Sequence, residues 1–448
     1  MTVLNKGENL FLFLGDIFFF IFSLWLMLFI RYHELPSSEA FLQHLVPFSV
    51  LFLVWIIVFF IAGLYDKHTV ILQGKLPGII FNAQLVNTIL AFLFFYFIPY
   101  FGITPKTNLF IYLIISFGFL FFWRIYCQSL FGFKQKENAI LIGSGDEMKE
   151  LKEEVNNNPR YNLSFISSVD LNEISGLDFK EEVLKTIYSE NVHVVAVDLK
   201  NEKVLPILPS LYNLIFSKIK FIDMYRVYED IFDRVPLSLV RYNWFLENIS
   251  TAPKATYDFL KRAMDIILSL VLGVISLVIY PFVIIAIKFE DGGPIFFVQE
   301  RVGKNNKIVC IRKFRSMTVH KESDGLAKDV RITKVGMFLR KSRIDELPQL
   351  WNVLRGDISL IGPRPELPIL VKLYEKKIPY YDIRHLIKPG LSGWAQLNQP
   401  IPPKFSANYD ETKTKLSYDL YYIKNRSFLL DLKIALKTIK ALLSRSGI

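Results

Sequence analysis

Long apolar runs with few polar interruptions dominate the first 130 residues of the chain. Four of them are long and apolar enough to span a hydrocarbon core of about 30 Å as helices: Leu10–Ile30, Leu45–Leu64, Ile79–Phe101 and Leu109–Trp123. The pattern predicts an α-helical membrane bundle of four spans over residues 1–130. Asp16 stands inside the first run, where a lipid-exposed carboxylate would be costly, so we expect it to face another helix.

Basic residues at the ends of these runs predict their direction. One group of ends carries Lys6, Lys67, Lys75, Arg124, Lys134 and Lys136, and the opposite group carries only Arg31 and Lys106. Because cytoplasmic loops are enriched in Lys and Arg, the N-terminus and everything after residue 124 are predicted to lie in the cytoplasm.

A different pattern, short apolar strands alternating with polar helix-like stretches, occupies residues 137–250. The expected strands are Asn138–Ile142, Leu163–Val169, Val192–Leu199 and Ile219–Met224. The alternation predicts a cytoplasmic α/β domain of Rossmann type. Gly143-Ser144-Gly145 suggests a dinucleotide turn, but Met148 replaces the third glycine of that fingerprint. A structural or regulatory role is therefore favoured over a bound nucleotide.

A fifth apolar run, Ile266–Ile287, is long enough to cross a bilayer. Pro281 lies inside it, and proline kinks or ends a helix. Basic residues flank both ends of the run: Lys261 and Arg262 before it and Lys288 after it. These features predict a re-entrant helix at about residues 262–288 that bends near Pro281 and returns to the same side. An ordinary fifth span is the alternative.

Composition and net charge indicate which kinds of partner to expect. The net charge is +11, which can indicate nucleic-acid binding. Here the basic residues accompany membrane segments, so anionic lipid headgroups and phosphate-bearing substrates are the expected partners, and no nucleic acid is expected. The only two cysteines, Cys127 and Cys310, lie far apart and form no zinc or disulfide pattern.

The polar region after residue 290 contains an acidic pair, Asp345-Glu346, at the start of a predicted helix. Pro348 suits a first helical turn, and Gly356 suits a helix end. Leu347, Leu350, Trp351 and Leu354 are predicted to form one apolar face. A position near the positive end of the helix dipole would favour ionised carboxylates. From spacing alone, however, Asp345 as a simple helix cap is the favoured interpretation.

Basic residues around the acidic pair favour a chemical role for Asp345 over a simple helix cap. Arg340 and Arg343 precede it, Asp357 follows the helix, and Gly362–Pro365 forms a stiff loop that carries Arg364. Arginine presents a planar fork that matches phosphate oxygens. The glycine-rich turn Lys388–Gln396 offers backbone N–H groups to a phosphate or a base. Two acids among many cations suggest phosphoryl transfer with a divalent metal.

Over about residues 255–445 the chain resembles the bacterial sugar transferase family, the monotopic phosphoglycosyl transferases. The resemblance rests on ordered motifs: Lys261-Arg262 with Asp265, Lys313–Met317, Asp345–Gln349, Gly362–Pro365, Pro389-Gly390 to Gln396, and a late run with Lys415, Tyr418-Asp419 and Tyr421-Tyr422. The N-terminal extension is similar to that of the large members, which initiate exopolysaccharide, capsule or O-antigen synthesis. The resemblance implies an α/β catalytic domain over residues 255–448, which lies at the bacterial cytoplasmic membrane and faces the cytoplasm.

The resemblance also implies the reaction. The enzyme transfers a sugar 1-phosphate from a UDP-sugar to undecaprenyl (polyprenyl) phosphate and releases UMP. Asp345 attacks the β-phosphate and forms a covalent phosphosugar-aspartate, which the lipid phosphate then attacks. Glu346 holds Mg²⁺ (or Mn²⁺) together with Asp345, or manages the acceptor proton. Substrate binding is expected from Lys313, Arg315, Asp329, Arg331, Arg340, Asp357, Arg364 and Gln396.

Two alternatives come from other classes of protein. A membrane-bound nucleotide-sugar dehydratase or epimerase would need an intact dinucleotide fingerprint and a Tyr-x-x-x-Lys pair, but the fingerprint is broken at Met148. A non-catalytic scaffold of polysaccharide export would not need Asp345 and Glu346. The sugar stays open among glucose, galactose and an N-acetylated amino sugar. A homodimer formed through the α/β domain and the spans is a hypothesis.

Overall fold

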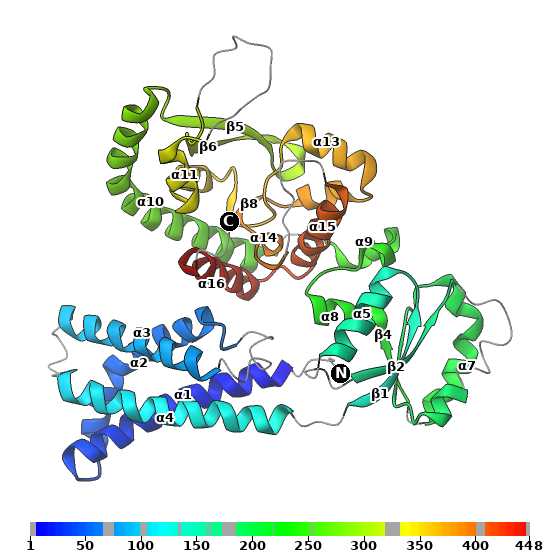
Figure 1. Cartoon of the computed structure of the whole chain (residues 1–448), viewed down its shortest axis with the longest axis horizontal. Helices are drawn as coiled ribbons and strands as arrows, with labels where there is room; N and C mark the ends of the chain where they lie inside the picture. The colour runs from blue at the N-terminus through cyan, green and yellow to red at the C-terminus, as the bar shows by residue number, and fades with distance from the viewer. Residues whose placement is uncertain are drawn as a thin grey trace. The chain divides into compact units, whose positions relative to one another are not determined.

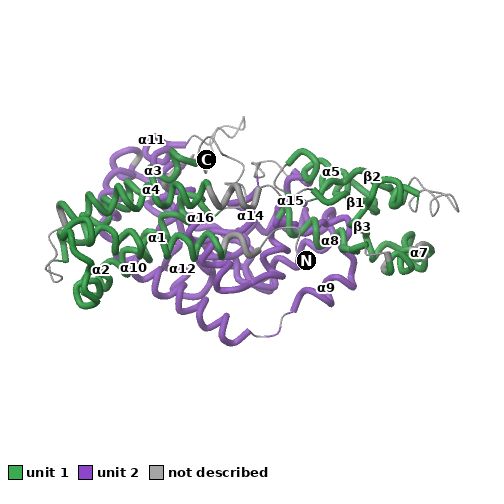
Figure 2. Tube along the Cα trace, turned by 90° about the horizontal axis from the view of Figure 1, so that it is seen from below, with its two compact units in different colours: residues 1–232 green, residues 233–448 purple. Residues whose placement is uncertain are grey.

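The computed structural model describes residues 6–65, 76–98, 105–132, 136–158, 161, 163–172, 185–217, 219–250, 252, 254–318, 332–399 and 408–444. It divides into two compact units, residues 1–232 and 233–448 (Figures 1 and 2). The three domains predicted from the sequence, 1–130, 137–250 and 255–448, stay a prediction. The boundary between the units differs from that division, because residues 233–250 belong to the C-terminal unit.

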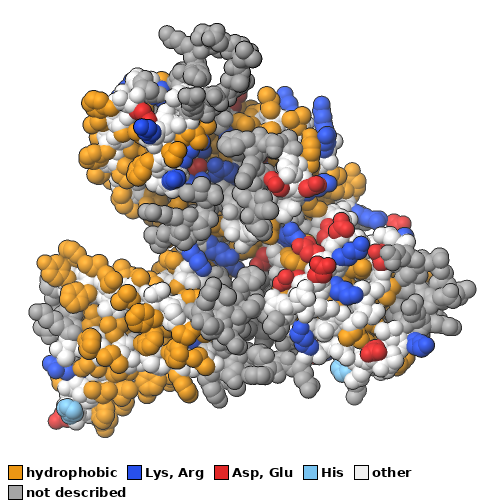
Figure 3. Space-filling view, in the orientation of Figure 1, with side chains coloured by type: hydrophobic (Ala, Val, Ile, Leu, Met, Phe, Trp, Pro, Cys, Tyr) orange, Lys and Arg blue, Asp and Glu red, His pale blue; other side chains and the backbone are white. Residues whose placement is uncertain are grey.

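Four helices occupy the apolar runs at the N-terminus: α1 (Lys6–Tyr32), α2 (Ser38–Ile61), α3 (Leu76–Phe97) and α4 (Pro105–Gly132). Helix α4 packs against α1 and α3, and α2 packs against α3. Each helix is long and apolar enough to cross a membrane, and apolar side chains cover the visible surface of the bundle (Figure 3). The helices therefore occur where the pattern predicted them, although the end of the third run, Phe101, lies outside the described residues.

Polar groups inside the bundle are paired. Asp16 of α1 is fully buried and forms an ion pair with the buried guanidinium of Arg124 of α4. The hydroxyl of Tyr65 donates to the same carboxylate (2.6 Å), and Nη1 of Arg124 donates to the carbonyl oxygen of Leu64 (2.6 Å). The expectation that Asp16 faces another helix is confirmed.

The α/β part contains one parallel sheet in the order β2-β1-β3-β4. Its strands are β1 (Glu137–Gly143), β2 (Leu163–Asp170), β3 (Val194–Val197) and β4 (Lys220–Asp223). Buried β1 and β3 carry continuous apolar side chains, as parallel strands covered on both faces do. The helical elements are α5 (Asp146–Asn157), η3 (Glu202–Ile207), α7 (Leu208–Asn213), η4 (Leu214–Ser217) and α8 (Met224–Phe232).

The C-terminal unit packs short strands and helices against one long helix. Its elements are η5 (Leu237–Leu239), α9 (Tyr242–Asn248), α10 (Ala255–Asp291), β5 (Phe296–Val302), η6 (Lys304–Asn306), β6 (Ile308–Phe314), α11 (Lys334–Lys341), η7 (Ile344–Glu346), α12 (Gln349–Arg355), β7 (Ser359–Ile361), α13 (Pro368–Lys377), η8 (Tyr381–Leu386), β8 (Gly390–Ser392), α14 (Trp394–Asn398), α15 (Tyr409–Lys424) and α16 (Phe428–Ser444). Strands β5 and β6 form an antiparallel hairpin, and β7 pairs with β8 in parallel.

The first turns of α10 are bound to this unit by polar contacts. Nζ of Lys261 donates to the carbonyl oxygen of Ile361 (2.9 Å) and pairs with the buried carboxylate of Asp431 on α16 (2.9 Å). Asp265 accepts hydrogen bonds from Oγ of Ser359 and the backbone N–H of Leu360, both at 3.0 Å. These contacts anchor the N-terminal end of α10 on β7 and α16.

The C-terminal half of α10 packs on the same unit through apolar side chains. Val283 and Ile287 join a buried cluster with Phe314 of β6 and Leu339 of α11. The helix is continuous through Pro281, so the proline does not end it, and α10 changes direction along its length (Figure 1). Its bounds exceed the predicted 262–288 at both ends.

Between these anchors, α10 presents a broad apolar surface. Its large exposed side chains include Ile267, Val271, Ile275, Val278 and Phe282, and apolar side chains cover its visible face (Figure 3). A soluble unit rarely exposes a contiguous apolar patch of this kind. This surface is therefore suited to lipid, while the re-entrant path stays a prediction.

Candidate active site

The acidic pair lies in a turn of its own. Asp345 and Glu346 belong to the 3₁₀ turn η7, and α12 begins three residues after Glu346, at Gln349. Arg343 precedes the turn in the left-handed conformation (φ 58°), and Gly356 ends α12 in the same region (φ 90°). Gly356 ends the helix as predicted, whereas the two acids lie before α12 and not in its first turn.

The predicted apolar face of α12 is partly wrong. Leu350 and Val353 are buried, and so are the polar side chains of Gln349 and Asn352. Trp351, placed on the buried face by helical spacing, is 37% exposed. Asn352 is buried because its amide reaches neighbouring elements, donating to the carbonyl oxygen of Cys310 (2.9 Å) and to the carboxylate of Asp357 (3.0 Å).

Glu346 is surrounded by cations from three segments. Its Oε1 lies 3.2 Å from Nζ of Lys313 on β6, 3.1 Å from Nη2 of Arg364, and 3.8 Å from Nη1 of Arg343. Burial alone would raise the pKa of this carboxyl, but the three cations outweigh burial and lower the pKa to about 2. Glu346 is therefore ionised at every physiological pH.

Asp345 has a different environment, although it is adjacent in sequence. Its side chain is buried, and its Oδ1 has no hydrogen-bond partner among the described residues. Burial and the charge of Glu346 raise its pKa, while Lys313, Arg340 and Arg343 oppose the rise. The expectation that a helix dipole would favour the ionised form is wrong here, because burial outweighs the nearby positive charge.

The fold fixes the positions of the cations around Asp345. Lys313 projects from the hairpin β5–β6, and burial lowers its pKa against the opposing effect of Glu346. Nε of Arg340, near the end of α11, donates to Oγ of Ser316 at 2.8 Å. A buried carboxylate oxygen without a partner, next to fixed cations, is suited to meet an incoming phosphate group.

The loop that carries Arg364 is tied to its neighbours through its backbone. The N–H of Gly362 donates to the carbonyl oxygen of Ser392 (2.8 Å), and the N–H of Gly390 donates to that of Pro363 (2.9 Å). A Cβ atom at position 390 would collide with the backbone of Gly362, so glycine is needed for this approach. The glycine-rich turn thus supports the arginine loop.

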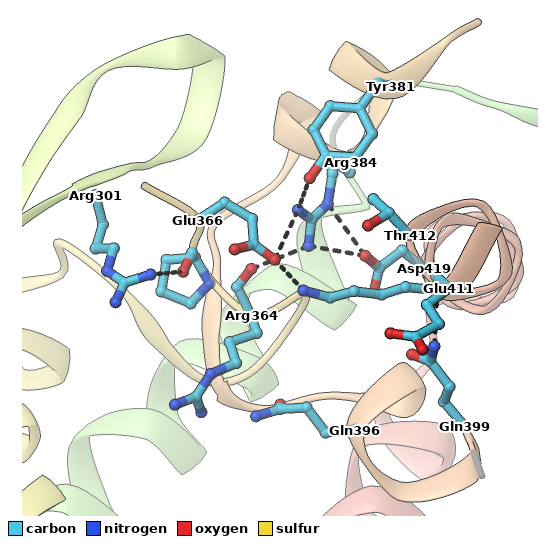
Figure 4. A network of polar contacts seen from close by, with 12 residues as sticks. Arg301, Arg364, Glu366, Tyr381, Arg384, Gln396, Gln399, Glu411, Thr412 and Asp419 are labelled. Carbon is cyan, nitrogen blue, oxygen red and sulfur yellow. Dashed lines mark hydrogen bonds and ion pairs between the residues drawn. The ribbon is translucent and has the colours of Figure 1, made fainter. Parts of the chain in front are cut away.

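A buried charge cluster completes this support (Figure 4). Arg384 is 1% exposed and lies 2.8 Å from Asp419 and 3.6 Å from Glu366, and its Nη2 also donates to the carbonyl oxygen of Arg364 (3.0 Å). Lys415 forms a second ion pair with Glu366. Burial alone would raise the pKa of Glu366, but Lys415 and Arg384 lower it to about 2. The cluster holds the backbone at Arg364 and Glu366 in place.

Sequence reasoning did not assign a role to Glu366 or Arg384. Lys415 and Asp419 were noted only as part of a late motif. The available signal was a set of charged residues after the arginine loop and in the late motif, and such charges are equally typical of solvated surface. Their burial makes them structural partners of the arginine loop.

Each of the other residues predicted to bind substrate has a different environment. Arg315 is buried against Gly293, where a Cβ atom would collide with its guanidinium. Asp357 accepts the hydrogen bond from Asn352 described above. Gln396 is exposed at the surface of α14, and its Nε2 donates to the carbonyl oxygen of Leu391 (3.4 Å). Asp329 and Arg331 lie outside the described residues.

The residues present fit a divalent cation only in partnership with substrate. Within the described segments, no group of three or more His, Cys, Asp and Glu side chains is placed to hold a metal. Mg²⁺, however, is commonly bound by one or two carboxylates together with substrate phosphates and water. The unpartnered Oδ1 of Asp345 beside ionised Glu346 is an arrangement of that kind.

Comparisons with known proteins place the resemblance in the same region. The sequence profile of the bacterial sugar transferases matches residues 256–445. A UDP-N-acetylgalactosamine-undecaprenyl-phosphate N-acetylgalactosaminephosphotransferase of Aeromonas hydrophila is 44% identical over 202 residues, 44% of this chain and 47% of that protein. A UDP-glucose:undecaprenyl-phosphate glucose-1-phosphate transferase of Klebsiella pneumoniae is 38% identical over 195 residues, 42% and 41% of the two chains.

These two matches thus cover less than half of each relative. A shorter relative, the uncharacterized sugar transferase EpsL of Bacillus subtilis, is 42% identical over 191 residues, which is 42% of this chain and 90% of EpsL. The residues matched by the family profile, 256–445, include the acidic pair, its cations and the arginine loop. The chain belongs to the bacterial sugar transferase family.

Proposed function

We propose that this protein transfers a sugar 1-phosphate from a UDP-sugar to undecaprenyl phosphate and releases UMP, with Asp345 as the nucleophile. The observation that carries the proposal is the buried Oδ1 of Asp345, which has no hydrogen-bond partner in the described part of the chain and is under the influence of Lys313, Arg340 and Arg343. The activities for which the Aeromonas and Klebsiella relatives are named support the reaction class.

In the first step, an oxygen of Asp345 attacks the β-phosphorus of the UDP-sugar. A new P–O bond forms to the carboxylate, and the bond to the oxygen that bridges the two phosphates breaks. UMP leaves with that oxygen and its electron pair. Lys313 and Arg340 lie where they can offset the charge that develops on the transferred phosphate.

In the second step, an oxygen of undecaprenyl phosphate attacks the same phosphorus. The bond to Asp345 breaks, the carboxylate is regenerated, and the product is an undecaprenyl-diphospho-sugar. Two displacements at one site allow a water-soluble donor and a lipid acceptor to react in turn. Glu346 keeps Lys313 and Arg364 in position through both steps.

A bound Mg²⁺ or Mn²⁺ would neutralise diphosphate charge as a Lewis acid. Asp345 and Glu346 are the residues that would hold it. UMP release is then expected to stop when EDTA is added and to return when excess Mg²⁺ restores free cation.

The proposed membrane arrangement has the four N-terminal helices as spans and α10 as a re-entrant helix. Both ends of α10 contact one compact unit, through Lys261 and Asp265 at one end and Val283 and Ile287 at the other. A helix that crossed the bilayer would carry its far end away from the cytoplasm, where nucleotide sugars are found. In this arrangement the acidic pair faces the cytoplasm at the bilayer surface, and the product initiates a surface polysaccharide.

The decisive experiment measures UMP release by the full chain in detergent with Mg²⁺, undecaprenyl phosphate and a panel of UDP-sugars. Asp345→Asn tests the nucleophile, and Asp382→Asn, at an exposed position on η8, is the matched control. Release that requires the lipid and one donor, is lost in Asp345→Asn and persists in the control is expected. Unchanged release by Asp345→Asn would refute the assignment of the nucleophile.

A further inference from the structure

Two neighbouring cavities lie around the N-terminal turns of α10 and do not include the acidic pair. One has a volume of about 420 Å³, the other about 240 Å³, and Asp258, Lys304, Ile387 and Arg426 line both. They adjoin the C-terminal end of α12, whereas Asp345 and Glu346 precede its N-terminal end. The reaction proposed above assigns them no role.

The smaller cavity has a basic lining. Its charged side chains are Lys261, Arg262, Lys304, Lys388 and Arg426, with Asp258 and Asp265 as the only acids among the described lining residues. Lys261 is neutralised by Asp431. Asp265 is occupied by hydrogen bonds from β7. An excess of positive charge therefore remains around the cavity.

Lys388 is the lining cation best suited to bind an anion. Its side chain is half-buried, yet within the described residues it has no ion pair or hydrogen bond. Burial, Arg262 and Lys304 lower its pKa, and Asp265 and Asp357 oppose that shift without cancelling it. Arg262 uses its guanidinium to bind the last carbonyls of α12, with Nη1 donating to Val353 (2.8 Å) and Nη2 to Leu354 (2.7 Å). Lys388 lines the smaller cavity, and the charges that act on its ammonium leave its pKa lowered.

The position of the cavities indicates where the anion comes from. The charged turns that line them, residues 254–265, directly precede the apolar exposed stretch of α10 that begins at Ile266. The larger cavity adds apolar side chains, including Ile249, Leu386 and Ile423. A basic recess next to apolar surface matches a phosphate attached to a glycerolipid, because phospholipid phosphates lie at this boundary.

We propose that these cavities bind the headgroup phosphate of an anionic phospholipid, held by Lys388 and Lys304. Arg426 adds positive charge beside them, while its Nε and Nη2 donate to the carbonyl oxygens of Ile423 and Ser250. The glycerol backbone of the lipid lies against the apolar wall. The bound anion neutralises the charge excess next to Gly356 and thereby stabilises the junction between α10 and the C-terminal end of α12. The site is separate from the transferase reaction, and the inference holds whether or not Asp345 is the nucleophile.

The test uses the delipidated full chain in detergent, without a UDP-sugar, and counts bound lipid by native mass spectrometry. Phosphatidylglycerol and phosphatidylcholine are titrated into the wild type, Lys304→Ala, and the double variant Lys304→Ala/Lys388→Gln. Lys304 is exposed, so its replacement leaves folding intact. Lys372→Ala, an exposed lysine on α13 outside the cavities, is the control for loss of charge.

The wild type is expected to bind phosphatidylglycerol more tightly than phosphatidylcholine. Each cavity lysine removed raises the Kd for phosphatidylglycerol about fivefold, and Lys372→Ala leaves it unchanged. Equal Kd values for the wild type and the double variant would overturn the proposal. Separate arms with inorganic phosphate, UMP and undecaprenyl phosphate identify other sources of phosphate. The phospholipid assignment is wrong if inorganic phosphate, UMP or undecaprenyl phosphate displaces bound phosphatidylglycerol at a lower concentration than a competing phospholipid does.

Discussion

The same chemical change at two adjacent residues is expected to have opposite effects on stability. Asp345→Asn and Glu346→Gln each replace a carboxylate with a carboxamide of similar size. Burial and Glu346 raise the pKa of Asp345, so its ionised form costs the folded state free energy at pH 7. The cations around Glu346 lower its pKa to about 2, so its ionised form stabilises the folded state.

The size of each effect follows from these environments. Lowering the pKa of Glu346 from 4.5 to about 2 corresponds to about 3 kcal/mol of stabilisation. For a unit of this size, about 2–4 °C per kcal/mol, Glu346→Gln should lower the Tm by about 6–12 °C. Asp345→Asn removes a buried charge whose Oδ1 has no hydrogen-bond partner among the residues that the structure describes, and it should raise the Tm by about 2–4 °C, or about 1 kcal/mol.

The assay is thermal unfolding of the full chain in one detergent, with Asp382→Asn as the control. The pH dependence checks the sign. The stabilisation by Glu346 is fully present above about pH 4.5 and is lost as the pH falls toward 2, so the gap between wild type and Glu346→Gln narrows there. The cost of Asp345 appears as the pH rises above 3.8. If both variants shift the Tm in the same direction at pH 7, the contrast between the two environments is wrong.

Three further outcomes test other parts of the structure. Arg384→Met leaves two buried carboxylates without their shared partner, so it should destabilise the protein by about 3–5 kcal/mol and lower kcat/KM for UMP release; unchanged unfolding and kinetics would contradict the support role. Asp16→Asn should lower the Tm in detergent by leaving the buried Arg124 unpaired, and adding Arg124→Gln should restore part of the loss, which a double-mutant cycle measures. UMP release should fall at acid pH as Asp345 is protonated. Arg343→Gln removes a charge that lowers this pKa, so the acid limb of the rate profile should move to higher pH; a shift to lower pH would contradict the assignment.

Local patterns predicted much of the fold. Strand β2 begins at the predicted residue, Leu163, and ends within one residue of its predicted end. The four apolar runs and the long run at α10 all form helices. Each of these features depends on neighbours in sequence, where the period of apolar positions carries the information.

Features that depend on distant contacts were not predictable in this way. Trp351 is exposed and Asn352 is buried, which is the reverse of the predicted helix faces. Asn352 is buried because its amide donates to groups 42 residues upstream and five residues downstream. Arg384 lies 35 residues from Asp419 and forms a buried pair with it. The ionisation of Asp345 depends on burial, which spacing cannot give. The charge pattern placed Arg364 near the acidic pair, whereas a role for Lys313 at the site was expected only from the resemblance to a known family.

The boundary between the two units has a practical consequence for the design of shortened proteins. The family match begins at residue 256, but the chain before it already contributes to the C-terminal unit. The carbonyl oxygen of Asp233 accepts a hydrogen bond from the indole of Trp394 (2.8 Å), and the N–H of Val235 donates to the carbonyl oxygen of Ser417 (3.1 Å). An expression fragment that starts at residue 256 would lose these hydrogen bonds to α14 and α15, whereas a fragment that starts upstream of Asp233 keeps them.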